Sequence, residues 1–250
     1  MKFQKINLSI AGFLIQVTFK AYKDTDQKRI IKGILKYHHG FIIDDSLNKP
    51  DFYILLSKEY KKRRQKRNRI ECNIKYFPQF VFLISGIVQQ LLNKTGFLLH
   101  ASSAVKDDKA ILFFGPSGVG KSTVIRLLSG TMEPFSDDGV YIKKEKGQFY
   151  VYQTPFREEN NLIEKTGQRF QLGAICFLKK DHIFEIKKIQ NKQYWLIKLI
   201  EQTFSDKQYI VSQIQCVFNM VKNFDRIYLF KFAENKNGIL KLFSKKDIFY

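Results

Sequence analysis

The stretch from Gly115 to Thr123 constrains the chain more than any other. It reads Gly-Pro-Ser-Gly-Val-Gly-Lys-Ser-Thr and fits the phosphate-loop pattern G-x-x-x-x-G-K-S/T. Apolar residues 110–114 precede it and the mostly apolar residues 124–128 follow it, so we expect a strand to enter the loop and a helix to leave it. This strand–loop–helix unit predicts an α/β fold.

The motif also predicts an anion site. Glycines let the backbone turn with its N–H groups facing inward, and the dipole of the following helix adds positive potential there. Lys121 is expected to reach the β- and γ-phosphates of a nucleotide, and the Ser122 hydroxyl to help hold Mg²⁺. The alternative is a glycine-rich turn that binds no nucleotide. The candidate nucleotide-binding residues are Gly115, Pro116, Ser117, Gly118, Val119, Gly120, Lys121, Ser122 and Thr123.

Two adjacent acids, Asp137 and Asp138, follow soon after the helix expected from Lys121. Phosphoryl transfer needs a carboxylate for the metal and often another to accept the acceptor's proton. A helix and a turn could return the chain to the mouth of the loop, so this pair is the candidate for both roles. The alternative is a surface turn, because Asp-Asp-Gly is favourable turn chemistry.

Composition narrows the class of protein without choosing a partner. The chain has 250 residues, 44% of them hydrophobic, which suits one large or two small globular domains. Lys and Arg (43) exceed Asp and Glu (23), and the net charge of +20 favours anionic partners such as nucleotides, acidic peptides, nucleic acid or membrane surfaces. The odd, widely spaced Cys72, Cys176 and Cys216 predict reduced buried thiols.

The sequence favours a cytoplasmic protein without a membrane span. The N-terminus lacks a continuous apolar core followed by a small-residue cleavage site. The most apolar helical stretch, Phe80 to Leu92, is interrupted by polar residues and is too short to cross a bilayer.

The first part of the chain, residues 1–95, is expected to form a small α/β unit. Residues 3–19 alternate apolar and polar, with a break at Ala11-Gly12, which predicts a hairpin. Residues 24–37 have a helical repeat and 51–56 read as a strand, while 77–94 read as a buried helix. His38-His39 could ligate a metal, but no third ligand is well spaced, and a solvated helix end is preferred.

A basic run lies between Lys58 and Arg69, where Glu59 is the one acid. Clustered Lys and Arg residues bind phosphate backbones or acidic partners. The alternative is the solvated tip of a hairpin, since no aromatic side chains are interleaved in the basic core.

Residues 97–105 are expected to form one strand. His100 would then lie on the neighbour of the strand that leads into the phosphate loop. Arg157, in a turn, is either a phosphate clamp or a solvated side chain. The other expected strands are 149–153, 172–178, 184–189, 227–232 and 239–243, and the other expected helices are 194–204 and 211–221.

The segments 98–105, 113–123 and 135–138 together resemble the core of the HPr kinase/phosphorylase family and its short relatives. This core is similar to that of ATP-dependent phosphoenolpyruvate carboxykinase. The resemblance runs over about residues 97–142, with weaker likeness at 152–156 and 173–178. The upstream His100 and the close acid pair make it more specific than the loop alone.

The resemblance implies a mixed β-sheet with flanking helices over 96–250 that phosphorylates a hydroxyl with ATP and Mg²⁺. Lys121 and Ser122 would bind phosphates and metal. Asp137 and Asp138 would supply the metal contact and the general base, in either order. His100 would tune that base, unless it is a structural residue of a core strand.

The resemblance also narrows the acceptor. The Glu-Ile-Arg-Gly segment of full-length HPr kinases is missing after residue 150, so HPr itself is not the expected substrate. The chain is more similar to short relatives encoded with peptide-modification systems, some of which phosphorylate a serine in a precursor peptide. This implies a peptide or protein acceptor with a Ser or Thr hydroxyl, and a serine of a modified precursor peptide is the first expectation. A small-molecule hydroxyl is one alternative, and a non-catalytic nucleotide- or nucleic-acid-binding module is another. The sequence leaves open both homo-oligomer formation and partner docking by residues 1–95.

Overall fold

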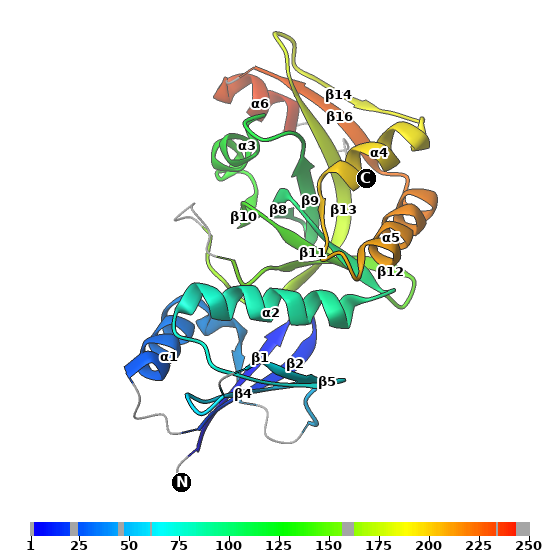
Figure 1. Ribbon diagram of the computed structural model, residues 1–250. Helices are drawn as coiled ribbons and strands as arrows, with labels where there is room; N and C mark the ends of the chain where they lie inside the picture. The colour runs from blue at the N-terminus through cyan, green and yellow to red at the C-terminus, as the bar shows by residue number, and fades with distance from the viewer. Residues whose placement is uncertain are drawn as a thin grey trace. The chain divides into compact units, whose positions relative to one another are not determined.

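The computed structural model describes residues 3–20, 25–44, 48–60, 62–156, 163–233 and 235–243. The chain divides into two compact units (Figure 1). Unit 1 comprises Met1–Leu91 with Lys165–Gly167, and unit 2 comprises Leu92–Glu164 with Gln168–Tyr250. Each unit has its own mixed β-sheet, so the predicted α/β class with a mixed sheet and flanking helices is confirmed.

Unit 1 is built on a sheet with strand order β3-β1-β2-β4-β6-β5. Ala11 and Gly12 join β1 to β2 with φ angles of 52° and 74°, the left-handed conformation of a tight hairpin turn, as the sequence predicted. The strands are β1 (Phe3–Ile10), β2 (Phe13–Lys20), β3 (Ile42–Ile43), β4 (Phe52–Leu56), β5 (Arg64–Lys66) and β6 (Arg69–Cys72).

Two helices, α1 (Thr25–Tyr37) and α2 (Phe77–Leu92), pack together in unit 1. Gly33 gives the Phe77 ring room, because a Cβ at Gly33 would lie 2.4 Å from the Phe77 Cδ2 atom. His38 is buried between Phe77 and Phe41, of the short 3₁₀ helix His39–Phe41, whereas His39 is exposed. The expected solvated helix end is therefore wrong for His38, which an aromatic cluster holds.

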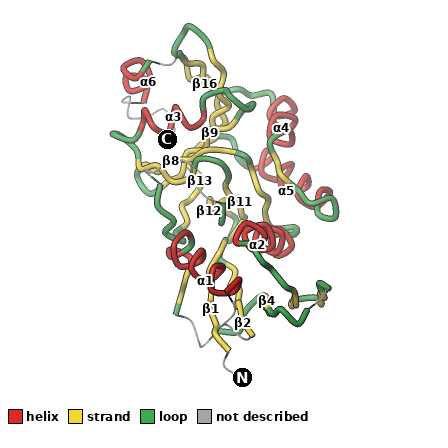
Figure 2. Tube along the Cα trace, turned by 60° about the vertical axis from the view of Figure 1, so that its left-hand side comes forward, coloured by secondary structure: helices red, strands yellow, loops and turns green. Residues whose placement is uncertain are grey.

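Unit 2 has a larger sheet, with strand order β10-β8-β9-β13-β12-β11-β7-β15; β16 pairs with β13, and β14 with β16. The long β13 runs through the unit (Figure 2) and is parallel to both β9 and β16. The strands are β7 (Gly96–Leu99), β8 (Ala101–Lys106), β9 (Lys109–Phe114), β10 (Glu133–Ser136), β11 (Val140–Glu145), β12 (Gln148–Gln153), β13 (Arg169–Lys180), β14 (Glu185–Lys188), β15 (Thr203–Phe204) and β16 (Ile227–Phe232).

Helices cover both faces of this sheet (Figure 1). Helices α3 (Lys121–Leu128) and α6 (Lys236–Phe243) pack on one face. Helices α4 (Lys192–Glu201) and α5 (Ile210–Asn223) pack on the other, where Trp195 is almost fully buried. Both faces of the central strands are therefore apolar, which explains the continuous hydrophobic run before the loop.

Three predictions need correction. Residues 97–105 form two strands, because β7 pairs with β11 and β15 whereas β8 pairs with β9 and β10. Residues 239–243 belong to a helix, because Ile239 and Phe243 are one turn apart and both are buried on the face with α3. The helix expected over 194–204 ends at Glu201, and Thr203–Phe204 pairs with β7.

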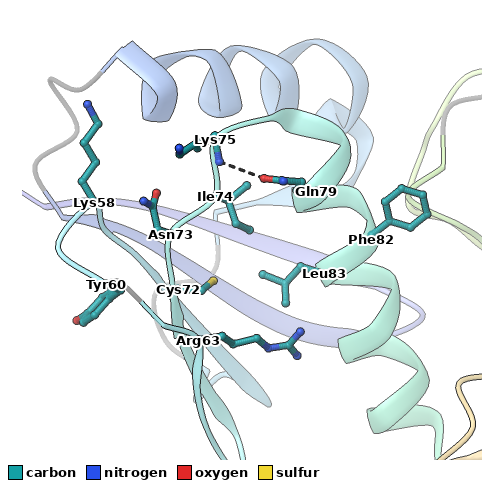
Figure 3. Close-up of a pocket in the computed structure, with 10 residues that line it drawn as sticks. All are labelled: Lys58, Tyr60, Arg63, Cys72, Asn73, Ile74, Lys75, Gln79, Phe82 and Leu83. Carbon is teal, nitrogen blue, oxygen red and sulfur yellow. Dashed lines mark hydrogen bonds between the residues drawn. The ribbon is translucent and has the colours of Figure 1, made fainter.

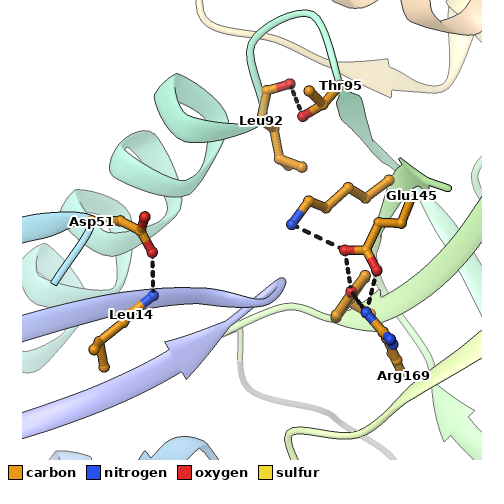
Figure 4. Close-up of polar contacts among 8 residues, drawn as sticks. Leu14, Asp51, Leu92, Thr95, Glu145 and Arg169 are labelled. Atoms are coloured by element: carbon orange, nitrogen blue, oxygen red, sulfur yellow. Dashed lines mark hydrogen bonds and ion pairs between the residues drawn. The ribbon is translucent and has the colours of Figure 1, made fainter. Parts of the chain in front are cut away.

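Polar contacts fix the strand register within each unit (Figure 4). In unit 1, the Leu14 amide donates to an Asp51 carboxylate oxygen at 2.8 Å, next to the parallel pairing of β2 and β4. In unit 2, Glu145 accepts hydrogen bonds from Arg169 and Tyr152, which ties β11 to β12 and β13. Burial raises the pKa of Tyr152 to about 12, with Arg169 opposing and Glu145 adding to the shift, so the phenol stays protonated.

Two further sequence expectations can be compared with the described residues. Cys72, Cys176 and Cys216 are buried free thiols, as predicted. In the described part of the chain, no helix is both long and apolar enough to cross a membrane.

Gly33 in α1 and Gly86 in α2 give a matched test of the α1–α2 contact. Gly33→Ala should lower the free energy of unfolding by about 2 kcal/mol, because the new methyl group overlaps the Phe77 ring. Gly86→Ala should raise it by about 0.5–1 kcal/mol, because a Cβ there meets nothing within 4 Å and alanine favours a helix. Urea denaturation measures both, and equal changes would contradict the packing described.

Candidate active site

The loop between β9 and α3, residues 115–120, is named the glycine loop below. Gly115, Gly118 and Gly120 have φ angles of 154°, 75° and 105°, which side-chain-bearing residues rarely adopt. A Cβ at Gly115 would crowd the Leu178 carbonyl at 3.2 Å, and a Cβ at Gly120 would crowd the Phe232 ring at 3.2 Å. The predicted strand–loop–helix arrangement is confirmed, and its backbone has the turn that an amide-lined anion cradle needs.

Lys121 begins α3, and its side chain folds back over the glycine loop. Its amine donates to the carbonyl oxygens of Gly115 at 3.1 Å and Pro116 at 3.4 Å, and the residue is only 7% exposed. Burial lowers the pKa of Lys121, while the negative charges of Asp138 and Asp137 act in the opposite direction. The acid pair therefore lies close enough to stabilise the ammonium form.

The two acids stand in the turn between β10 and β11 but in different surroundings. Asp137 is 7% exposed, and it accepts hydrogen bonds from the Ser102 hydroxyl at its backbone oxygen (2.7 Å) and at its carboxylate (3.1 Å). The Asp138 side chain is 63% exposed. Ser136 closes the turn by donating to the Gly139 carbonyl at 2.8 Å. The structure thus gives one anchored carboxylate and one open to solvent.

His100 lies at the break between β7 and β8, next to the open acid. Its Nε2 atom is 3.6 Å from a carboxylate oxygen of Asp138. Its ring contacts the Phe204 ring at 5.4 Å, and its backbone amide donates to the Gln202 carbonyl. Burial and then the charge of Lys121 lower the pKa of His100, while Asp138 opposes them. The neutral imidazole is the favoured form beside this carboxylate.

The structure brings together Lys121, Asp137, Asp138 and His100, all four of the expected catalytic residues. Ser122 is exposed in the first turn of α3, and Thr123 is half-buried behind it. Pro116, Ser117 and Gly118 are exposed at the loop tip, where a ligand could reach the backbone N–H groups of Ser117 and Gly118. Arg157 lies outside the described residues.

Three residues at this site were missed by sequence reasoning. Ser102 has a fully buried hydroxyl. In the sequence, the sign of its role was a polar residue within a largely apolar strand. Lys180 lies at the end of β13, and its Cε atom is 3.8 Å from the position that a Cβ atom would take at Gly120. Its signal was a lysine directly after a buried strand. Phe204 gave no signal, because it lay inside an expected helix.

The donor set of the site can be compared with what a nucleotide and its Mg²⁺ would need. No group of three His, Cys, Asp or Glu side chains suited to a metal occurs among the described residues. Mg²⁺ is commonly held by one or two carboxylates together with substrate phosphates and waters. The Ser122 hydroxyl, the acid pair and the loop amides match that pattern, with the phosphates supplied by the ligand.

Fold and site together define an α/β protein in which a glycine loop and a buried lysine face a pair of carboxylates. The family described as SynChlorMet cassette protein ScmC matches residues 72–223, and the chain belongs to this family. Among solved structures, the chain is similar to the HPr(Ser) kinase/phosphatase from Coxiella burnetii, with 15% identity and a TM-score of 0.27. That alignment covers 37% of this chain and 72% of the other. No curated protein matches the sequence.

The titration of His100 tests this geometry. Replacing Lys121 by Met removes a positive charge, so the pKa of His100 should rise; Asp138→Asn removes a negative charge, so it should fall. Histidine ring signals followed by NMR in nucleotide-free protein measure both, with His100→Gln to assign the resonance. An unchanged pKa in both variants would contradict the described proximity.

The lowered pKa of His100 also predicts how the stability of the folded protein changes with pH. The pKa of folded His100 lies below its ordinary value of 6.5, so neutral His100 contributes stability above that pH, and the contribution is lost as the pH falls. His100→Gln should therefore lose less stability than the wild-type protein between pH 7 and pH 5.

Proposed function

We propose that the chain is a Mg²⁺-dependent kinase that transfers the γ-phosphate of ATP to a hydroxyl of a peptide or protein, in the first place that of a serine. The observation that carries the proposal is that the buried Lys121, at the start of α3, lies within electrostatic range of both Asp137 and Asp138, which stand in the turn between β10 and β11. Phosphoryl transfer needs a lysine that binds phosphate, a carboxylate that holds the metal and a carboxylate that accepts a proton, and these residue types meet here.

The different surroundings of Asp137 and Asp138 suggest a different role for each carboxylate. Asp138 is exposed and stands beside neutral His100, so it can accept the acceptor's proton. Asp137 is held by Ser102, which suits a carboxylate that must keep a fixed position toward a cation. Bound Mg²⁺ would neutralise phosphate charge, with Ser122 and Asp137 as its protein ligands.

The proposed step is a displacement at the γ-phosphorus, with the attacking and leaving oxygens roughly in line. The acceptor O–H proton passes to the Asp138 carboxylate while the hydroxyl oxygen bonds to the γ-phosphorus. The bond from that phosphorus to the β–γ bridging oxygen breaks, and ADP leaves. Lys121 and the loop amides stabilise the negative charge on the phosphate oxygens. His100, beside Asp138, orients the carboxylate.

Two alternatives use the same residues. A small-molecule hydroxyl could replace the peptide hydroxyl, although the exposed Phe204 ring beside His100 favours an acceptor with an apolar group near its hydroxyl. A module that binds nucleotide without turnover would need the glycine loop but not Asp138. Transfer and binding measurements separate these cases.

Loss of the acid pair should abolish transfer of labelled γ-phosphate from ATP to a mixture of Ser- and Thr-containing peptides. We expect Asp138→Asn alone to lower turnover by about 10²-fold or more while Mg·ATP affinity changes little, because a base acts in the chemical step. Lys121→Ala should weaken nucleotide binding as well as turnover. Turnover is measured by scintillation counting and affinity by calorimetry.

Asp107 and Asp108 offer a matched control, because they are a second adjacent acid pair in unit 2, in the turn between β8 and β9. Both have positive φ angles that asparagine tolerates, and both are exposed. Asp107→Asn with Asp108→Asn should leave transfer unchanged. Wild-type turnover in the Asp137/Asp138 double variant would refute the proposed reaction.

Lys180 should contribute to nucleotide binding, because its side chain passes over Gly120. We expect Lys180→Ala to weaken Mg·ATP binding about fivefold, the effect of one charge-assisted contact to a phosphate. Lys179→Ala is the control, since adjacent strand residues point to opposite faces. Equal losses in the two variants would indicate only a general charge effect.

A further inference from the structure

Unit 1 contains a hollow of about 700 Å³ that the proposed reaction does not use (Figure 3). It lies between the end of β6, the chain that follows it, and the first turns of α2. The residues that line it are Lys58, Tyr60, Arg63, Cys72, Asn73, Ile74, Lys75, Gln79, Phe82 and Leu83.

Part of this lining is apolar. Cys72, Ile74 and Leu83 are at most 9% exposed, whereas Phe82 is 71% exposed on α2. Burial raises the pKa of the Cys72 thiol to about 11, so the thiol is neutral near pH 7 and adds no charge. An exposed phenylalanine beside a shielded apolar surface can contact an apolar side chain of a partner.

The charged side chains in the described lining are all positive. Lys58, Arg63 and Lys75 line the hollow, and none of the described residues that line it is acidic. The neighbouring acids are engaged elsewhere, because Glu59 pairs with Lys20 and Glu71 pairs with Arg69 at 2.7 Å. The hollow therefore offers positive potential next to an apolar surface.

The hollow is preformed by regular structure. The Cys72 carbonyl accepts from the Ser57 amide at 3.1 Å, which ties the chain after β4 to β6. The Lys75 amide donates to the Gln79 side chain at 3.2 Å, which holds the entry to α2 (Figure 3). A partner would therefore bind without first having to order these walls.

We propose that this hollow binds an acidic peptide segment that also carries an apolar side chain. We further assign this segment to the peptide that presents the acceptor hydroxyl, a step that rests on the proposed kinase function. Carboxylates of the segment would pair with the three cations, and its apolar side chain would pack on Phe82 and Leu83.

A peptide fits these observations better than a nucleic acid. A nucleic acid strand needs cations spaced along its backbone and aromatic faces for its bases. Here the cations surround buried aliphatic and thiol groups, which offer no stacking face, and the aromatic residues of the described lining are Tyr60 and Phe82. The exposed basic hairpin of β5 and β6 lies beside the hollow and would strengthen attraction to acidic peptides at long range.

The test uses the full-length protein without nucleotide and a fluorescein-labelled dodecapeptide of alternating Glu and Leu. Fluorescence polarisation measures its affinity, and a peptide of alternating Glu and Ser has the same charge without the apolar groups. The hollow variant carries Lys58→Glu, Arg63→Glu and Lys75→Glu. The matched helix variant carries Lys28→Glu, Arg29→Glu and Lys32→Glu on exposed positions of α1.

We expect the hollow variant to bind the Glu/Leu peptide about 30-fold more weakly and the helix variant to stay within about threefold of wild type. Phe82→Ala should weaken binding of the Glu/Leu peptide about fivefold and leave the Glu/Ser peptide unaffected. Circular dichroism confirms that each variant is folded.

Three results would overturn the proposal: no binding of the Glu/Leu peptide at 1 mM probe, equal losses in the hollow and helix variants, or tighter binding of an oligothymidylate that displaces the peptide. Lys121→Met separates this proposal from the kinase function, because it should keep full peptide binding. Peptide binding in the hollow without any phosphate transfer would sustain the docking site and overturn its assignment to an acceptor.

Discussion

The hydrogen bonds from Ser102 to Asp137 are the interaction on which the rest of the site depends. They join the start of β8 to the turn after β10, so the acid pair is held against the strand next to the loop strand. The same short segment carries His100, because the chain changes strand partners there. The break between β7 and β8 thus places Ser102, which holds Asp137, and His100, which lies beside Asp138.

Opposing electrostatic effects follow from that arrangement. Burial disfavours the charge on Lys121, and the acid pair restores it; His100 is pushed toward its neutral form by burial and by the same lysine. A phosphate group entering the glycine loop would supply the negative charge that a buried ammonium lacks. This arrangement supports the proposal that the site binds an anion and that the exposed Asp138 carboxylate accepts a proton.

The sequence was informative where local chemistry decides the structure. The glycines, Lys121 and the flanking apolar runs predicted the loop, and the closeness of Asp137 to it followed from one helix and one turn. Residues 239–243 were misassigned because a short apolar run fits both a strand and a helix turn, and packing against α3 decided between them. Strand pairing between distant segments split 97–105, and no local pattern carries that information. The hollow in unit 1 was visible only as a basic run, because its apolar lining comes from β6 and α2 as well.

The anomalous signal of Mn²⁺ in crystals grown with a non-hydrolysable ATP analogue would show whether the glycine loop, Lys121 and the acid pair bind one nucleotide together. We predict one manganese ion bonded to the Ser122 hydroxyl, to an acid-pair carboxylate and to β- and γ-phosphate oxygens in the glycine loop. An analogue bound elsewhere, or a manganese ion that neither aspartate approaches, would contradict the central claim that loop, lysine and acid pair form one reaction centre.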